Sequence, residues 1–164
     1  MVDLGAGTGR LTAELARVAR RVVAVELPRE PFSVIANLPF TGVNEILRHL
    51  LDDPRLPLER ADLVVEWGVA VKRALPWPST VNGVIWGAWY TTRVARRLPR
   101  HAFDPQPETD AAVLVFERRA EPLVPPRRAR EYRRYVAAGF RRAHDARRRD
   151  PYEWAARFTA SARP

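Results

Sequence analysis

The sequence predicts an α/β fold with a basic helical extension at its C-terminal end, and three features support this prediction. A short apolar stretch, Val2–Leu4, runs into a glycine-rich turn and then into a helical pattern. Further apolar runs alternate with helical patterns as far as Arg119, as in sheets whose strands are joined by helices. Beyond that point, prolines lead into an arginine-rich helical pattern. We therefore expect a core over residues 1–119 and a basic helical extension over residues 120–164.

The elements of the core follow from hydrophobic periodicity. Apolar residues recur at helical spacing over Leu11–Arg20, which predicts a helix after the glycine turn. The β-branched run Arg21–Leu27 predicts a second strand, and Phe32–Leu38 predicts a third. A second helix is expected over Gly42–Leu51, and the turn-forming residues Asp52–Pro54 end it.

The second half of the chain is expected to complete a parallel sheet and add two helices. Ala61–Val71 and Ala111–Glu117 have the apolar character of buried strands. Arg127–Ala146 places aromatic residues at intervals of three to four among arginines, which predicts one amphipathic helix. A short final helix is expected to dock Trp154 and Phe158. The tryptophans of the core are interpreted mainly as packing residues: Trp67, Trp77, Trp86 and Trp89.

Composition bounds the kind of protein. The 164 residues are 46% apolar, which is enough for one domain with a core. There is no cysteine, and the three histidines have no ligand-like spacing, so we expect no metal site. No apolar run is long enough for a membrane span or a signal peptide, so we expect a cytoplasmic protein. We also expect the protein to be a monomer.

The positive charge is concentrated in one quarter of the chain. The net charge is +9, and the segment from Arg118 to Arg149 holds twelve arginines against three acidic residues. Such a cluster is typical of a protein that binds a polyanion. The alternative is a solvated helix face without a partner.

A glycine-rich turn follows the first strand in the stretch DLGAGTG, residues 3–9. Glycines there allow the backbone to approach a ligand, and the following helix offers free amides at its N-terminus. Glu26 ends the second strand, where α/β nucleotide-binding folds place the acid that accepts hydrogen bonds from ribose hydroxyls. Because the turn lacks a lysine followed by serine or threonine, it favours an adenosine-containing ligand without a polyphosphate. The alternative is a tight turn that binds nothing.

The third strand ends at the stretch NLPF, residues 37–40. The Asn37 amide oxygen and the Leu38 carbonyl are expected at the carboxyl edge of the sheet, where open α/β sheets bind ligands. Pro39 stiffens this corner because it lacks an N–H and restricts the backbone. Two acceptors and the ring of Phe40 suit a flat base with an amino group, whose two hydrogens are held while the nitrogen lone pair stays free. The alternative is a strand end with an Asx turn and a buried phenylalanine.

Four stretches in this order resemble the ribosomal RNA adenine dimethyltransferases: VDLGAGTGRLT, VVAVEL, VIANLPF and FDPQPETDAA. The stretch EWGVAVKRALPWP and the tryptophan-rich run up to Tyr90 make the chain most similar to the erythromycin-resistance (Erm) branch, which acts on 23S ribosomal RNA. The resemblance runs from Val2 to Arg119. It implies the Rossmann-like sheet of class I S-adenosylmethionine-dependent methyltransferases, here in truncated form.

The resemblance also implies residue roles. A methyl group would pass in line from the sulfonium of S-adenosylmethionine to the exocyclic nitrogen of an unstacked adenine in ribosomal RNA, with positioning as the main source of catalysis. The cofactor would be held by Asp3, Gly5, Ala6, Gly7, Glu26 and Asn37. The target adenine would be held by the catalytic residues Asn37, Leu38, Pro39 and Phe40. RNA phosphates would be held by Arg127, Arg128, Arg133, Arg134, Arg141 and Arg142.

The chain departs from the family between Glu26 and the NLPF stretch. Family members have a helix and a strand there, whereas this chain has only Pro28–Pro31. A parallel connection must return a strand length, roughly 17 Å, and move about 10 Å sideways, whereas four residues reach about 14 Å at most. We therefore expect that the standard arrangement cannot form: the second strand shortens and shifts, leaves the sheet or pairs elsewhere.

Three functions fit these features. The first is an Erm-type methyltransferase that modifies 23S ribosomal RNA and blocks macrolide-class antibiotics. The second is a truncated remnant that binds RNA through Arg127–Arg149 without catalysis. The third is the same methyl transfer to DNA adenine or to a protein amide, because related motifs serve those substrates.

Overall fold

The computed structural model describes residues 2–4, 13, 14, 16, 17, 23–25, 30–39, 42–75, 80–142 and 148–161. The chain divides into two compact units, residues 1–31 and residues 32–164. In the first unit, β1 (Val2–Leu4) and β2 (Val23–Val25) form a parallel pair. Residues 13, 14, 16 and 17 are helical. The predicted order of strand, helix and strand is confirmed in these described residues.

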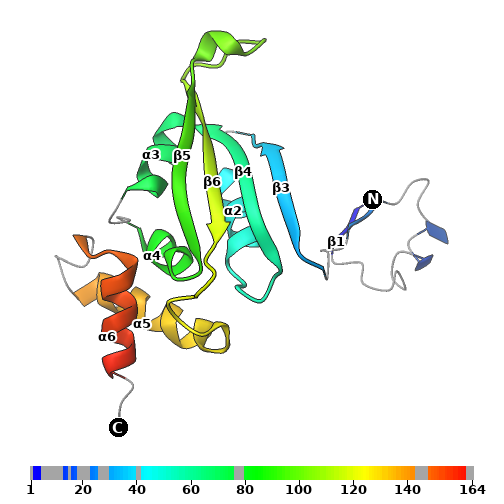
Figure 1. The fold of residues 1–164 in the computed structure, drawn as a ribbon. Helices are drawn as coiled ribbons and strands as arrows, with labels where there is room; N and C mark the ends of the chain where they lie inside the picture. The colour runs from blue at the N-terminus through cyan, green and yellow to red at the C-terminus, as the bar shows by residue number, and fades with distance from the viewer. Residues whose placement is uncertain are drawn as a thin grey trace. The chain divides into compact units, whose positions relative to one another are not determined.

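The second unit contains a four-stranded sheet with the order β3-β4-β6-β5 (Figure 1). Its strands are β3 (Phe32–Asn37), β4 (Leu58–Glu66), β5 (Tyr90–Leu98) and β6 (Ala111–Arg118). β3 and β4 are parallel, whereas β6 runs antiparallel to both of its neighbours. The expectation of a wholly parallel sheet is therefore wrong. The α/β class is confirmed.

The described strands form two sheets, because β1 and β2 pair with each other and β3 begins the second sheet. How the strands on the two sides of the four-residue connection are arranged stays a prediction.

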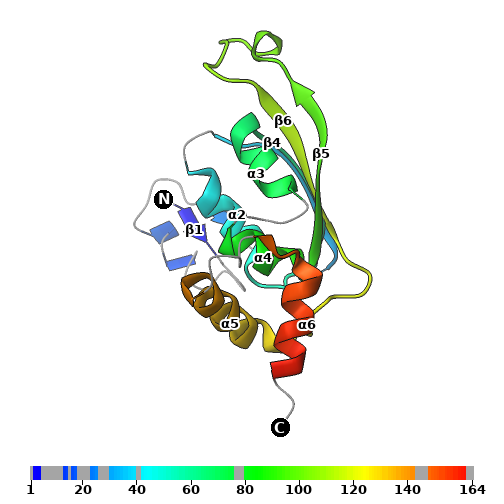
Figure 2. The ribbon, with the colours of Figure 1, turned by 90° about the vertical axis from the view of Figure 1, so that its left-hand side faces the viewer.

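One face of the four-stranded sheet is covered by α2 (Val43–Leu51), α3 (Trp67–Ala74) and α4 (Val81–Gly87) (Figures 1 and 2). Alternation along β3 shows the two faces. Phe32 and Val34 pack against the core, whereas the side chain of Ile35 is 87% exposed. None of the described helices of this unit covers the face on which Ile35 lies, which we call the open face.

The predicted strand over Ala61–Val71 is wrong at both ends. β4 begins three residues earlier, and the chain turns into α3 after Glu66. The backbone N–H of Trp67 donates to the carbonyl oxygen of Asp110 at 2.9 Å, which ties the start of α3 to the residue before β6. The apolar residues after Glu66 therefore form a helix that packs on the sheet. Sequence patterns also missed α4, β5 and a short 3-10 helix over Arg100–Ala102.

The tail forms a 3-10 turn over Pro126–Arg128, then α5 (Ala129–Arg142) and α6 (Pro151–Ser161). Trp154 and Phe158 are buried, which confirms the prediction that the last helix docks through them. The ring of Tyr132 makes edge contacts with Trp89 at 5.9 Å and with Phe158 at 5.2 Å between ring centroids. Tail and sheet thus share one hydrophobic core, and the domain boundary after residue 119 stays a prediction.

Candidate active site

Asn37 lies at the carboxyl end of β3. Its backbone pairs with Val64 of β4, and the N–H of Leu38 donates to the carbonyl oxygen of Val64 at 3.0 Å. Leu38 is buried and anchors the corner, whereas Asn37 and Pro39 are exposed. The Asn37 amide makes no hydrogen bond to any other residue that the structure describes. Its acceptor oxygen is therefore available to a ligand at the edge of the sheet.

The hairpin between β5 and β6 is fixed at the same edge. Asp110 accepts hydrogen bonds from Arg97 Nε at 2.9 Å, from Arg97 Nη2 at 2.7 Å and from the backbone N–H of Arg100 at 2.9 Å. The bond from the Arg100 backbone, followed by those from Arg97, lowers the pKa of Asp110. The Arg97 guanidinium also stacks 4.8 Å above the ring of Trp67. These contacts order the predicted FDPQPETD stretch beside the end of β4.

The predicted cofactor residues lie mostly outside the described residues. This holds for Gly5, Ala6, Gly7 and Glu26, and also for Phe40 of the adenine corner. The backbone of Asp3 lies in β1 and pairs with Ala24, and the next pair, Leu4 with Val25, immediately precedes Gly5 and Glu26 in the sequence. Parallel strands in this register end at one edge, which suits a glycine turn and an acid that bind one adenosine-containing ligand.

The basic tail lies at the opposite edge of the four-stranded sheet (Figure 1). The N–H of Arg119 donates to the Trp89 carbonyl at 2.9 Å, and the N–H of Leu123 donates to the Ala88 carbonyl at 2.8 Å. The tail therefore starts beside the beginning of β5. Because β5 extends over nine residues, its other end is roughly 25 Å away.

The six arginines predicted to bind RNA fall into two groups. Arg128 bonds to Glu131 at 3.0 Å and stacks 4.2 Å over Phe158, and Arg133 pairs with Asp52 at 3.0 Å. The other four are exposed and make no hydrogen bond or ion pair within the described part of the chain: Arg127, Arg134, Arg141 and Arg142. Their role in RNA binding stays a prediction.

Two polar centres hold the fold together, and sequence reasoning did not single out the first of them, Arg118. Arg118 donates to the carbonyl oxygens of Leu58 at 2.7 Å, of Pro54 at 3.1 Å and of Leu56, and to the Tyr90 hydroxyl at 3.0 Å. Asp52 accepts a 2.7 Å hydrogen bond from the Trp86 indole N–H. Asp52 thus has a structural role at the end of α2, as the helix-end interpretation predicted.

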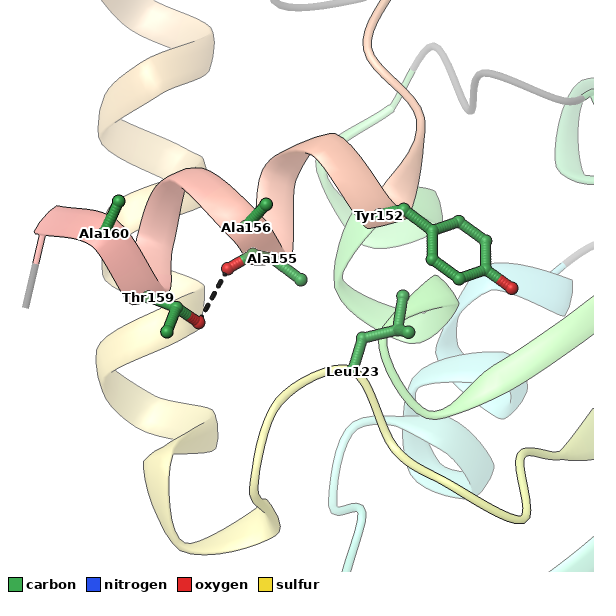
Figure 3. A pocket seen from close by; sticks show the side chains of 6 residues that line it. All are labelled: Leu123, Tyr152, Ala155, Ala156, Thr159 and Ala160. Atoms are coloured by element: carbon green, nitrogen blue, oxygen red, sulfur yellow. Dashed lines mark hydrogen bonds between the residues drawn. The ribbon is translucent and has the colours of Figure 1, made fainter.

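Two hollows among the described residues lie away from the Asn37 corner. One, of about 420 Å³, lies along α6 (Figure 3) and is lined by small or apolar residues together with Tyr152, whose hydroxyl accepts a hydrogen bond from Arg119. The other, of about 670 Å³, is a polar groove at the tail edge, lined by Asp52, Asp53, Pro54, Arg55, Pro126, Arg127, Ala129, Arg130 and Arg133. Asn37 lines neither of these hollows.

The described residues were also compared with what a metal site and a membrane-spanning helix require. Across the described residues, no group of three or more histidine, aspartate or glutamate side chains could hold a metal ion. Among the helices that the structure describes, none is long and apolar enough to cross a membrane.

Comparison with curated proteins finds relatives that are named for rRNA methylation or for antibiotic resistance. The chain is 30% identical over 169 residues to an rRNA adenine N-6-methyltransferase of Corynebacterium diphtheriae, covering 85% of this chain and 66% of that protein. It is 33% identical over 175 residues to an rRNA methyltransferase of Streptomyces thermotolerans, covering 85% and 56%. It is 30% identical over 164 residues to the mycinamicin-resistance protein MyrB of Micromonospora griseorubida, covering 83% and 52%. The chain thus spans about half to two thirds of the length of these relatives.

A solved structure with the same fold is that of the 23S rRNA methyltransferase ErmE. The match has a TM-score of 0.63 and 23% identity, and it covers 96% of this chain and 88% of that one. The family model described as ribosomal RNA adenine dimethylase matches residues 27–146, which include the Asn37 corner, the whole four-stranded sheet and α5. The chain therefore belongs to the ribosomal RNA adenine dimethylase family.

Proposed function

We propose that this chain is an S-adenosylmethionine-dependent methyltransferase that modifies the N6 nitrogen of an adenine in 23S ribosomal RNA. It acts as a cytoplasmic monomer and confers resistance to macrolide, lincosamide and streptogramin antibiotics. The observation that carries the proposal is the exposed Asn37 amide at the carboxyl end of β3, next to a buried Leu38 that fixes the corner. The family supports the chemistry, and the names of the similar proteins support both the substrate and the resistance.

The family's cofactor is S-adenosylmethionine, which supplies a methyl group activated as a sulfonium. The described backbone fits it, because the paired ends of β1 and β2 lead directly into Gly5 and Glu26. The glycine turn, residues 5–7, would bind the cofactor through backbone amides, and Glu26 would accept hydrogen bonds from its ribose hydroxyls.

Asn37 acts on the adenine. Its amide oxygen accepts one hydrogen of the exocyclic amine, and the Leu38 carbonyl accepts the other, so the nitrogen lone pair faces the incoming methyl group. When bound, S-adenosylmethionine would supply its methyl group to this nitrogen, and the proton that the methylated nitrogen releases would leave to solvent. Alignment of the reacting atoms supplies most of the rate enhancement. A side chain that fixes the position of the amine therefore raises the rate more than a strong base would.

A second candidate function is an RNA-binding remnant without catalysis. The observation that favours it is the set of exposed tail arginines that make no hydrogen bond or ion pair within the described part of the chain: Arg127, Arg134, Arg141 and Arg142. Calorimetric titration with S-adenosylmethionine separates the two candidates. Binding at micromolar to millimolar ligand is expected of the enzyme, and its absence at millimolar ligand would leave the remnant.

The role of Asn37 is tested by transfer of labelled methyl groups to 23S ribosomal RNA. We expect Asn37→Ala to lower the rate by about 100-fold or more, because positioning of the amine is lost. Ser33→Ala is the matched control, since Ser33 is an exposed polar residue on the same face of β3. Equal rates in Asn37→Ala and the wild type would reject the assignment of Asn37.

The substrate and the biological role need separate assays. Transfer to 23S ribosomal RNA is compared with transfer to 16S ribosomal RNA, to DNA and to protein. Expression in a macrolide-sensitive bacterium is expected to raise the inhibitory concentration of erythromycin. Transfer to DNA or protein instead of RNA would support the third function named from the sequence.

A further inference from the structure

One cross-strand row connects the Asn37 corner to the far strand of the sheet. Asn37 pairs with Val64, Val64 pairs with Val113, and Val113 pairs with Arg96 of β5. Neighbouring strands lie about 4.8 Å apart, so three steps place the Arg96 backbone roughly 14 Å from that of Asn37. The arginine therefore lies beside the candidate site, whereas α5 and α6 lie at the other end of the strands.

A β-bulge turns Arg96 toward the same face as Asn37. Arg93 pairs with Val115, and after an irregularity between Val94 and Arg96 the latter pairs with Val113. Val113 and Val115 alternate with the core residues of β6, so both of these pairs lie on the open face. In a regular strand, Arg93 and Arg96 would point to opposite faces. The bulge thus gathers two arginines on the face where the Asn37 side chain is exposed.

Arg93 and Arg100 add to the positive charge around Asp62 and Asp110, but both carboxylates are already held by other arginines. Within the described residues, neither Arg96 nor Arg100 forms an ion pair or a side-chain hydrogen bond, and Arg93 is exposed as well. Asp62, the nearest acid in the row of Arg93, is already bound by Arg60 at 2.6 Å. Of the acids of the same hairpin, Asp110 is held by the Arg97 side chain and accepts the backbone N–H of Arg100, and Asp104 and Glu108 belong to the loop beyond the strands.

We propose that Arg93, Arg96 and Arg100, here called the hairpin arginines, bind phosphates of the RNA strand that carries the target adenine. Guanidinium groups are well suited to phosphate, and phosphate contacts fix the register of a nucleic acid on a protein. The strand would cross the open face from Asn37 toward β5, a few nucleotides from the modified base. The proposal rests on the proposed function, and it assigns the contacts nearest the base to the hairpin arginines instead of the tail.

The test is RNA binding by a triple variant, Arg93→Gln, Arg96→Gln and Arg100→Gln. The probe is a fluorescein-labelled RNA stem-loop with an adenine in its single-stranded loop, followed by anisotropy over about 50 to 200 mM salt. Losing three phosphate contacts on a single strand should lower the slope of log K against log salt by about 2 and weaken binding about tenfold or more.

The matched control is Arg48→Gln, Arg55→Gln and Arg157→Gln, which removes the same charge from exposed positions of the same unit, away from the open face. It is expected to retain the wild-type slope, since those arginines lie outside the proposed path. Unfolding temperatures of both triple variants should match that of the wild type. An equal loss of slope in the two triple variants would show a general charge effect and overturn the proposal.

Methyl transfer separates this inference from the proposed function. If the wild type transfers methyl groups, the hairpin variant should raise KM for RNA with little change in kcat, whereas unchanged KM and unchanged binding would reject the hairpin surface alone. If the wild type transfers none yet the hairpin variant still loses RNA affinity, the surface stands and the methyltransferase assignment fails. Wild-type protein that does not bind the stem-loop at low salt would overturn the surface.

Discussion

Gly139 lies in α5 where the indole of Trp154 from α6 packs against the helix backbone. A Cβ atom added at this glycine would lie 2.7 Å from Trp154 Cζ3 and closer still to Cη2. The indole is 1% exposed and is stacked on Phe140 with ring centroids 5.5 Å apart. It also meets the ring of Tyr135 edge-on at 5.9 Å. The ring therefore has no free space into which it can move.

Two opposing terms set the effect of Gly139→Ala. Alanine in a helix interior is favoured over glycine by about 1 kcal/mol. Overpacking a buried contact costs about 1–3 kcal/mol, and the rigid indole puts this case near the upper end. We expect a net destabilisation of about 2 kcal/mol, which corresponds to a fall in unfolding temperature of about 4–8 °C for a chain of this size.

Thermal unfolding followed by far-ultraviolet circular dichroism and by tryptophan fluorescence measures this effect. Gly68→Ala in α3 is the control, because its added Cβ would meet Glu66 Oε1 at 3.5 Å, an ordinary contact. That variant should gain up to about 1 kcal/mol. If Gly139→Ala were as stable as Gly68→Ala, α6 would not be seated on α5 through Trp154, and the packing described for these two helices would be refuted.

Two other substitutions test the interior and the hairpin. The Tyr132 hydroxyl is buried with no hydrogen-bond partner in the described part of the chain, and burial raises its pKa, so Tyr132→Phe should increase the free energy of unfolding by about 1 kcal/mol. A loss of stability in denaturant titrations would instead reveal a partner for that hydroxyl. Asp110→Asn should reduce stability at neutral pH, because the hydrogen bonds from the Arg100 backbone and from Arg97 lower the pKa of the carboxylate below its ordinary value of 3.8. The wild-type advantage is present above that ordinary value and is lost as pH falls through the lowered folded-state pKa; an advantage that stayed constant from pH 7 to strongly acidic conditions would contradict it.

Hydrophobic alternation predicted a strand correctly where one face is buried and a proline marks the end. Phe32–Leu38 alternates and stops at Pro39, and β3 ends one residue before the predicted end. β4 was misplaced because Glu59 and Arg60 interrupt its first residues, whereas the apolar run beyond Glu66 belongs to α3. Local pattern alone does not distinguish a strand that continues from a strand that turns into a buried helix.

β5 and α4 could not be read from the sequence for related reasons. β5 carries three arginines in nine residues and lies at the sheet edge, so it lacks the apolar signal of a buried strand. α4 contains two glycines and β-branched residues, which disfavour helices. It forms because Thr80 caps it by accepting a 3.1 Å hydrogen bond from the Gly83 N–H and because tertiary packing buries Trp86 and Ile85. The surface proposed to bind RNA therefore lies largely on β5, a strand that the sequence analysis did not predict.

The candidate site divides in the same way. The Asn37 corner was predictable, because its residues are contiguous and their chemistry depends on local geometry. The position of the tail was not, since it depends on contacts such as the Trp89 indole N–H with the Val124 carbonyl at 2.8 Å. These contacts place the basic helix at the edge of the sheet away from Asn37.

The location of the arginines changes how the charge excess should be interpreted. Arg118 bonds to three carbonyl oxygens, and Arg119 bonds to the Gly87 carbonyl at 2.9 Å and to the Tyr152 hydroxyl at 2.8 Å. Arg128 and Arg133 are likewise engaged with other parts of the fold. Guanidinium groups in such settings hold carbonyls and cover aromatic rings, so they contribute to folding before they can contribute to RNA binding. The net charge of the tail segment therefore overstates its value as an RNA-binding surface. The hairpin has only two exposed arginines on one face of β5, but the sheet places them on the same face as Asn37, the residue expected to hold the base.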